Sequence, residues 1–247
     1  MKTIKTSPKI IDIVCPCIKE HIPRLSVCSE SWKKHILNPI SQIFIIGPKD
    51  IEKDVTDMGF EYIEENKYLD ITDKNLKSVR KDRRGWLKQQ LIKLNGNPGE
   101  CQNYLCIDSD VFLIRQTPFI NNFGHPIFYM NNTYWKLAIE TAEKLLDKPH
   151  KEELSYVTDK MIFNVNVIQE LKNNLEKING KNWKQTIIES YDNQSIISFS
   201  EFELYGLFYQ GENEKQIKHY KRCKWNDEYT YEILMKKFLP FDQITFE

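Results

Sequence analysis

The chain has 247 residues, 40% of them hydrophobic and 28% charged, a composition that indicates a folded globular protein and excludes a disordered one. Lysine plus arginine and aspartate plus glutamate each number 35, so the formal net charge is zero. The sequence therefore lacks the overall basic field of a nucleic-acid-binding protein, and we expect no nucleic-acid partner.

The first predicted elements form a strand–helix–strand unit. Residues 10–14 are an apolar run stopped by Pro16, which predicts a buried strand. A helix is expected over 25–37 and a second buried strand over 43–46. Because this βαβ pattern requires parallel strands, we predict a mostly parallel sheet, with a third strand over 60–63.

A basic segment follows at residues 74–93, where eight basic side chains accompany one acid, Asp82. Its second part predicts a helix that ends near Asn95, because Leu87, Leu91 and Leu94 repeat at helical spacing and should face the core. On a neighbouring stripe the same helix carries the polar and aromatic residues Trp86, Gln89, Gln90 and Lys93. That stripe is either a binding surface or an exposed helix face.

The next strand, 104–107, leads directly into Asp108-Ser109-Asp110. In an open α/β sheet, ligands gather at the carboxyl ends of the strands. Mg²⁺ and Mn²⁺ prefer oxygen ligands, and Mg²⁺ often takes one or two carboxylates together with substrate phosphates. Asp108 and Asp110 are therefore predicted to bind a divalent cation, the alternative being a solvated turn.

The second half of the chain is less regular. Strands are expected over 111–114, 127–130 and 161–163, and a helix is expected around 167–178. Ser200 followed by Glu203 fits a capping box, which predicts the start of a helix. We expect one α/β domain over 1–247, built from a half that ends near residue 115 and a second half beyond it.

Three segments together resemble a bacterial family of GT-A-type glycosyltransferase-like proteins found in surface-polysaccharide gene sets. They are residues 84–94, residues 104–110 and residues 200–206. The resemblance implies a GT-A-like, Rossmann-type fold in which the first half binds a nucleotide-sugar donor and the second half binds the acceptor. It also implies that Asp108 and Asp110 hold Mn²⁺ or Mg²⁺ with the donor diphosphate, and that Ser109 lies near the donor ribose or sugar.

The other donor contacts are predicted from charge. A diphosphate carries more negative charge than one divalent ion cancels, and arginine and lysine both bind phosphate. Arg84 and Lys93 flank the helical stripe just before the strand that leads into Asp108. We therefore predict donor contacts from Arg84, Lys93, Gln90 and Trp86.

The acceptor side offers candidates for a catalytic base. Inverting GT-A enzymes use an acid that commonly lies at a helix start in the acceptor half, which implies Glu201 or Glu203 as the base. Glu203 has a structural alternative as part of the capping box, and Glu201 as a favourable charge at a helix N-terminus, so the choice stays open. Asp159 is a candidate for acceptor binding. His219 is a candidate third metal ligand, because some GT-A enzymes add a late histidine; its alternative is a surface position.

The predicted function is metal-dependent transfer of a sugar from a nucleotide-sugar donor to a glycan or lipid-linked acceptor in surface polysaccharide synthesis. Two alternatives remain: a HAD-like phosphohydrolase, whose first motif is also Asp-x-Asp after an apolar strand, and a non-catalytic GT-A-like binding module. No apolar run approaches the roughly 20 residues of a membrane span, and no export signal is recognisable. We expect a cytoplasmic protein with at most peripheral contact between its basic residues at 215–224 and the inner face of the membrane.

Overall fold

The computed structural model describes residues 9–72, 74–133, 135–151, 153–195, 197–217 and 219–246. Its central sheet has the strand order β3-β2-β1-β4-β7. The first four strands in the chain are parallel to one another and β7 is antiparallel to β4. The strands are β1 (Ile11–Pro16), β2 (Ile40–Gly47), β3 (Glu61–Glu64), β4 (Asn103–Ile107) and β7 (Lys160–Asn164). The predicted mostly parallel sheet is confirmed, with strand bounds within about three residues of the expected ones.

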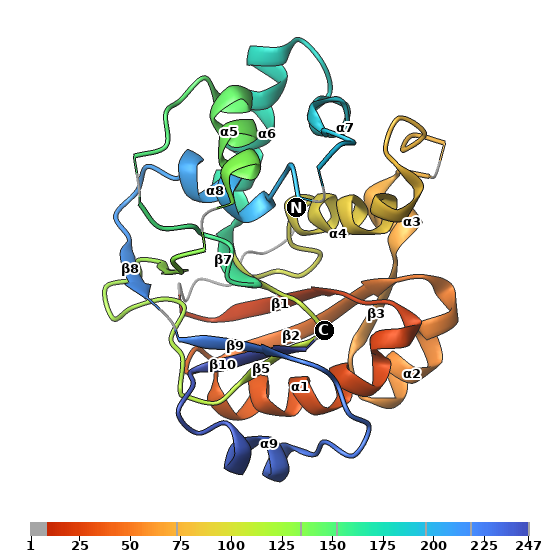
Figure 1. The fold of residues 1–247 in the computed structure, drawn as a ribbon, viewed down its shortest axis with the longest axis vertical. Helices are drawn as coiled ribbons and strands as arrows, with labels where there is room; N and C mark the ends of the chain where they lie inside the picture. Colours follow the sequence, from red (N-terminus) through yellow and green to blue (C-terminus); the bar gives the residue numbers. More distant parts are fainter. Residues whose placement is uncertain are drawn as a thin grey trace.

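Helices lie on both faces of this sheet. In Figure 1, α1 and α9 lie below it and α4, α5, α6 and α8 lie above it. The helices are α1 (Ile22–His35), α2 (Glu52–Asp57), α3 (Glu65–Leu69), α4 (Arg84–Leu94), α5 (Lys136–Leu146), α6 (Val165–Asn179), α7 (Trp183–Ser190), α8 (Glu201–Phe208) and α9 (Tyr231–Lys237), with short 3₁₀ turns at Lys19–His21, Lys49–Ile51 and Lys81–Arg83. The α4 helix ends, and the α8 helix begins, where the sequence predicts it.

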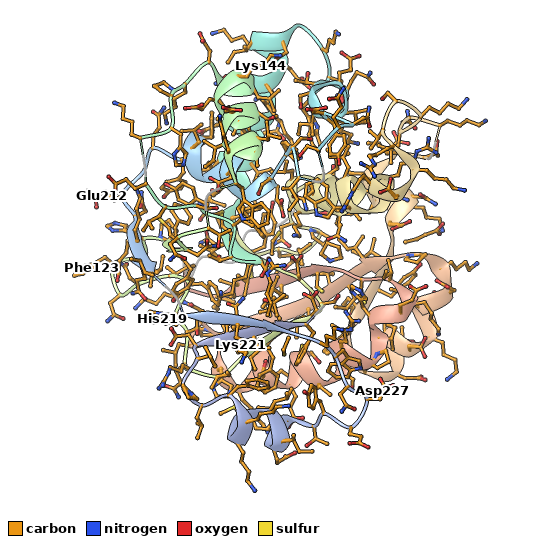
Figure 2. All side chains as sticks on the ribbon, in the orientation of Figure 1. Phe123, Lys144, Glu212, His219, Lys221 and Asp227 are labelled. Atoms are coloured by element: carbon orange, nitrogen blue, oxygen red, sulfur yellow. The ribbon has the colours of Figure 1, made fainter. Side chains whose placement is uncertain are left out.

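Two smaller sheets complete the fold. One has the order β5-β10-β9 (Val111–Leu113, Gln243–Phe246 and Tyr220–Cys223), and the other pairs β6 (Ile127–Met130) with β8 (Glu214–Ile217). In Figure 2, β9 crosses the front of the molecule with Lys221 along it and His219 towards the edge. The backbone N–H of Phe246 donates to the Asp110 carbonyl at 3.1 Å. The end of β10 therefore lies against the Asp108–Asp110 turn.

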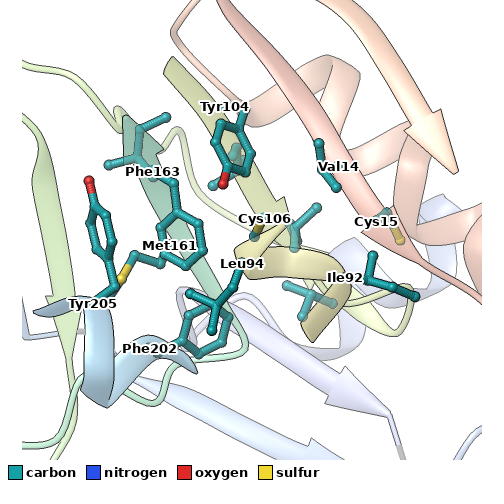
Figure 3. Close-up of a cluster of buried hydrophobic side chains, with 14 of the residues drawn as sticks. Val14, Cys15, Ile92, Leu94, Tyr104, Cys106, Met161, Phe163, Phe202 and Tyr205 are labelled. Carbon is teal, nitrogen blue, oxygen red and sulfur yellow. The ribbon is translucent and has the colours of Figure 1, made fainter. Parts of the chain in front are cut away.

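One part of the hydrophobic core lies between the strands β1, β4 and β7 and the helices α4 and α8. Figure 3 shows Tyr104 of β4, Phe163 of β7 and Tyr205 of α8 in this cluster, and the ring centroids of Phe163 and Tyr205 are 4.4 Å apart. Strands buried on both faces are continuous apolar runs, which is why β1 and β4 were recognisable in the sequence. Packing of α4 and α8 against these strands fixes the polar residues of both helices at the carboxyl edge of the sheet.

No helix among the described residues combines the length and the apolar character needed to cross a membrane. The six cysteines are all described and none forms a disulfide.

Candidate functional site

A cavity of about 660 Å³ opens at the carboxyl ends of β1, β2 and β4. Parallel strands bring their carboxyl ends to one edge, which is where α/β folds bind ligands. Both halves of the chain line it. Nine predicted site residues lie on its wall: Arg84, Trp86, Gln90, Lys93, Asp108, Ser109, Asp110, Asp159 and Glu201.

Asp108 and Asp110 lie on a turn that closes β4. The backbone N–H of Val111 donates to the Asp108 carbonyl at 3.1 Å, and both carboxylates reach the same cavity. Oδ1 of Asp110 is enclosed and has no hydrogen-bond partner among the described residues. Burial, together with the charges of Asp108 and Asp159, raises the pKa of Asp110 to about 8. The turn thus concentrates negative charge that the described part of the chain does not fully neutralise.

Lys93 of α4 supplies most of the compensating charge. Its side chain is 1% exposed, and its Nζ lies 2.6 Å from Asp108 Oδ1 and 2.6 Å from Glu201 Oε1. Burial alone would lower the pKa of Lys93, but the charges of Asp108 and Glu201 raise it above its ordinary value. One ammonium group therefore links the β4 turn to the start of α8.

Asp159 completes the acidic group. Its backbone is in the left-handed region, with φ at 60°, and its carbonyl accepts the Asp108 N–H at 3.0 Å. Its carboxylate accepts a hydrogen bond from Thr245 Oγ1 at 2.9 Å and lies 3.5 Å from an Arg222 nitrogen. A non-glycine residue in this conformation is held by its surroundings, and such residues cluster at functional sites.

Ser109 faces the end of β1. Its hydroxyl lies 3.0 Å from Nδ1 of His21, and burial, aided by the charge of Arg24, lowers the pKa of that histidine. Gly47, at the end of β2, allows a close approach here: a Cβ at this position would lie 2.2 Å from the Cys17 carbonyl oxygen. The ends of β1 and β2 can therefore come together at the rim of the cavity.

The α4 residues have mixed surroundings. Two guanidinium nitrogens of Arg84 donate hydrogen bonds to the carbonyls of Val79 (3.0 Å) and Lys77 (3.3 Å). These bonds tie the guanidinium to the preceding turn. Gln90 is buried and its Oε1 accepts the backbone N–H of Glu201 at 3.3 Å. Trp86 packs against Tyr191, with ring centroids 6.2 Å apart, and against the hydrophobic core, and it also lines the cavity.

The structure separates Glu201 from Glu203. Glu201 lines the cavity beside Lys93, and burial raises the pKa of its carboxyl group. Glu203 does not line it: Oε1 accepts hydrogen bonds from the Ser155 hydroxyl and the Tyr156 N–H, and the side chain is fully buried. The structure therefore places Glu203, the predicted alternative base, outside the cavity. Ser200 does cap α8, accepting from the Phe202 and Glu203 N–H groups at 3.2 and 3.4 Å.

His219, the predicted third metal ligand, also lies away from the cavity. His219 is exposed and does not line the cavity. Its N–H donates to the Asp242 carboxylate at 3.0 Å and its carbonyl accepts the Asp242 N–H at 2.8 Å, at the far end of the β9–β10 pair. Arg222, three residues further along, pairs in register with Thr245 and does line the cavity. In the sequence Arg222 was considered only as one of the basic residues at 215–224, so its place in the cavity was not predicted. The places of His21 and Arg24 in the cavity were not predicted either.

The acidic pair fits a hard divalent cation that also takes oxygens from a ligand. Among the described residues, no group of three or more His, Cys, Asp and Glu side chains is arranged to hold a metal ion. Two carboxylates and an unpartnered buried oxygen remain on the cavity wall. Mg²⁺ commonly binds through one or two carboxylates with the remaining positions filled by phosphate oxygens and water, and this site matches that pattern.

Comparisons with known proteins support the fold. Residues 9–237 match the model of a family described as a family of unknown function (DUF6492). A crystal structure of an active-site mutant of LgtC is similar at a TM-score of 0.51, with 9% sequence identity, and the match covers 96% of this chain and 87% of that one. A second structure, of the galactosyltransferase LgtC with donor and acceptor sugar analogues, has a TM-score of 0.48 at the same identity and coverage. No curated protein matches the sequence significantly. The expected GT-A-like fold is confirmed.

Proposed function

The chain belongs to the DUF6492 family of unknown function, and from that premise and its GT-A-like fold we propose that it is a metal-dependent glycosyltransferase that uses a nucleotide-sugar donor. The observation that carries the proposal is the cavity in which Asp108 and Asp110 meet cationic side chains from both halves of the chain. A sugar-transfer function explains why acids and cations share one cavity here.

We propose that the nucleotide lies over the ends of β1 and β2, with its diphosphate at the Asp108–Asp110 turn. A bound Mn²⁺ or Mg²⁺ would act there as a Lewis acid that neutralises the departing diphosphate. Asp108 and Asp110 would hold this ion, while Ser109, positioned by His21, faces the ribose or sugar. Arg222 and Arg24 line the same cavity and provide further positive charge for the phosphates.

Glu201 is the proposed base. It is the one acid of the first α8 turn that reaches the cavity, and its Oε1 is held 2.6 Å from Lys93 Nζ. A base works best when its pKa lies closer to the working pH, and burial raises the pKa of Glu201 in that direction. Glu201 would take the proton of the acceptor hydroxyl while Lys93 keeps the carboxylate charged and in place.

The acceptor enters, on this proposal, from the side lined by Asp159 and the residues of the second half. The resemblance to surface-polysaccharide proteins favours a glycan or lipid-linked saccharide as the acceptor. An acceptor of that kind is met at the cytoplasmic face of a membrane, where the exposed side chains of Lys215 and Lys221 on β8 and β9 offer weak attraction to anionic lipid.

A thermal-shift screen with Mn²⁺ or Mg²⁺ and UDP, GDP or CMP tests the proposal. A nucleotide at about a hundred times its Kd should raise the melting temperature by about 5–10 °C. Asp110→Ala should abolish the shift, whereas Asp57→Ala, which removes an exposed acid on α2, should keep it. Phosphate release from an aryl phosphate without nucleotide would instead support a phosphohydrolase. Absence of any nucleotide-dependent shift would overturn the proposal.

A further inference from the structure

The five tryptophans of the chain differ in how their indoles are used. Trp32 is fully buried and its Nε1–H donates to the Val111 carbonyl at 2.7 Å. Trp225 donates to Asp227 at 2.7 Å and packs against Phe246 with ring centroids 5.0 Å apart. These two indoles are satisfied by their own protein surroundings.

The next two are also partnered. Trp183 lies beneath the ammonium groups of Lys172 and Lys184, at 4.9 and 5.6 Å from its ring centroid. Trp86 packs against Tyr191 at 6.2 Å and against the hydrophobic core. Each of these rings therefore has at least one face covered by the protein.

Trp135 differs from these four tryptophans. Within the described part of the chain it makes no ring contact and does not pack against the hydrophobic core, although it lines the cavity. Its Nε1–H is enclosed without a hydrogen-bond partner among those residues. A buried indole N–H normally finds an acceptor, because an unpaired one loses the hydrogen bond that it makes in water. An indole of this kind is explained if a ligand, rather than the protein, completes its surroundings.

The topology places Trp135 on the acceptor side of the carboxylates. Along the sheet edge the order is β2, β1, β4 and β7, and β6 contacts β7 beyond it. Trp135 follows β6, whereas the Asp108–Asp110 turn follows β4 and Asp159 precedes β7. The two acids of the turn therefore lie between Trp135 and the strand ends where the nucleotide is proposed to bind.

The chemistry of the Trp135 side of the cavity identifies the class of ligand. An indole offers a broad apolar face and one N–H donor, and a pyranose ring offers an apolar C–H face bordered by hydroxyl acceptors. Asp159 also lines the cavity and adds an acceptor for a further hydroxyl. Pockets with one aromatic surface and a few convergent polar groups fix the orientation of a small polar ligand.

We propose that Trp135 is the stacking platform for a pyranose ring of the acceptor saccharide; this inference rests on the proposed transferase function and specifies its acceptor subsite. Trp135 acts here as a binding and specificity residue. The apolar face of the sugar lies on the indole, and a ring hydroxyl accepts the Nε1–H. This contact holds the acceptor hydroxyl on the Glu201 side of the donor diphosphate.

Indole ¹⁵N–¹H NMR of the whole chain tests the proposal. The probes are methyl pyranosides of glucose, galactose, mannose and N-acetylglucosamine, added with Mg²⁺ and the nucleotide found by thermal shift. The signal assigned by Trp135→Phe should move and saturate with at least one pyranoside, and the Trp225 signal, outside the cavity, should not move. Trp135→Ala should weaken that pyranoside about tenfold or more. Trp225→Phe is the matched control and should leave its affinity unchanged.

The outcomes separate the two proposals. If nucleotide stabilises both the wild type and Trp135→Phe but no pyranoside moves the Trp135 signal, the platform is wrong and the transferase proposal stands. If glycerol moves the signal as much as the pyranosides do, the platform is also wrong. If no nucleotide binds with a divalent ion, the transferase proposal fails and the platform fails with it.

Discussion

Asp12 and Asp110 lie at opposite edges of the central sheet and are treated very differently by their surroundings. Asp12, near the start of β1, is fully buried, and its carboxylate accepts from Gln42 N (3.2 Å), Asn97 Nδ2 (2.8 Å) and Cys101 N (3.0 Å). Asp110, after β4, leaves its Oδ1 with no partner among the described residues and faces two further acids. The first carboxylate ties β1 to β2 and to the loop between α4 and β4. The second is left for a ligand.

The difference shows how one residue type serves two purposes in one sheet. A buried carboxylate that is fully hydrogen-bonded stabilises the fold, whereas an unsatisfied one costs free energy that a bound ligand can recover. Lys93 is intermediate, because it neutralises Asp108 and Glu201 from within the protein. The acids at the carboxyl edge are therefore only partly compensated from within the protein, whereas the carboxylate at the amino edge has a hydrogen bond to both of its oxygens.

The largest effect is expected at Lys93. Lys93→Met removes the ammonium between two buried acids and should cost about 3–5 kcal/mol of stability, because uncompensated buried charges remain. Lys34→Met, which breaks an exposed ion pair with Glu30, should barely change the melting temperature. Chemical denaturation measures both. Adding Glu201→Gln to Lys93→Met should restore part of the loss; equal effects of the two single variants would contradict the buried-pair interpretation.

Asp110→Asn should have the next largest effect, and its two consequences have opposite signs. Losing a carboxylate ligand should weaken metal–nucleotide binding on the order of a hundredfold. Removing one of three neighbouring charges should stabilise the ligand-free protein at pH 8 by about 1–2 kcal/mol. Calorimetric titration and thermal melting measure the two quantities. A variant that binds nucleotide as the wild type does would remove Asp110 from the site.

The same substitution at the other edge, Asp12→Asn, should destabilise the protein by about 1–3 kcal/mol, because an amide cannot accept all three donors. Nucleotide affinity should stay unchanged, since Asp12 lies at the edge opposite the cavity. The pair of Asp-to-Asn variants thus forms a matched test by thermal melting. If both shift the melting temperature in the same direction, the distinction between the edges fails.

The sequence predicted the carboxyl edge because its signals are local. A continuous apolar run followed by Asp108 and Asp110 needs only the rule that buried parallel strands end at the ligand edge. The end of α4 at Leu94 followed from leucine spacing in the same way. The capping role of Ser200 followed from a local hydrogen bond.

The features that the sequence did not predict depend on contacts between distant segments. Glu201 and Glu203 are two residues apart on one helix and so point in different directions, and only the packing of α8 against α4 and Ser155 decides which faces the cavity. His219 and Arg222 are three residues apart on an extended segment, about 10 Å of chain. The β9 strand was missed because Tyr220–Cys223 is polar, and its place follows from pairing with β10.

The smallest expected effect is a pH dependence that the two edges should not share. The folded-state pKa of Asp110 is raised from 3.8 to about 8, so between these values the folded chain holds a proton that the unfolded chain has lost. The stability that this proton provides is complete below pH 4 and is lost as pH rises towards 8, by at most about 1.4 kcal/mol per pH unit. The melting temperature of the ligand-free wild type should therefore fall by a few degrees, about 2–5 °C, between pH 6 and pH 8.

Asp110→Asn should flatten this fall in melting temperature between pH 6 and pH 8, whereas Asp12→Asn should leave the fall as it is in the wild type. Because a cation binds the ionised carboxylates, the stabilisation by metal and nucleotide should grow over the same interval. A fall that persists unchanged in Asp110→Asn would assign the proton to another group.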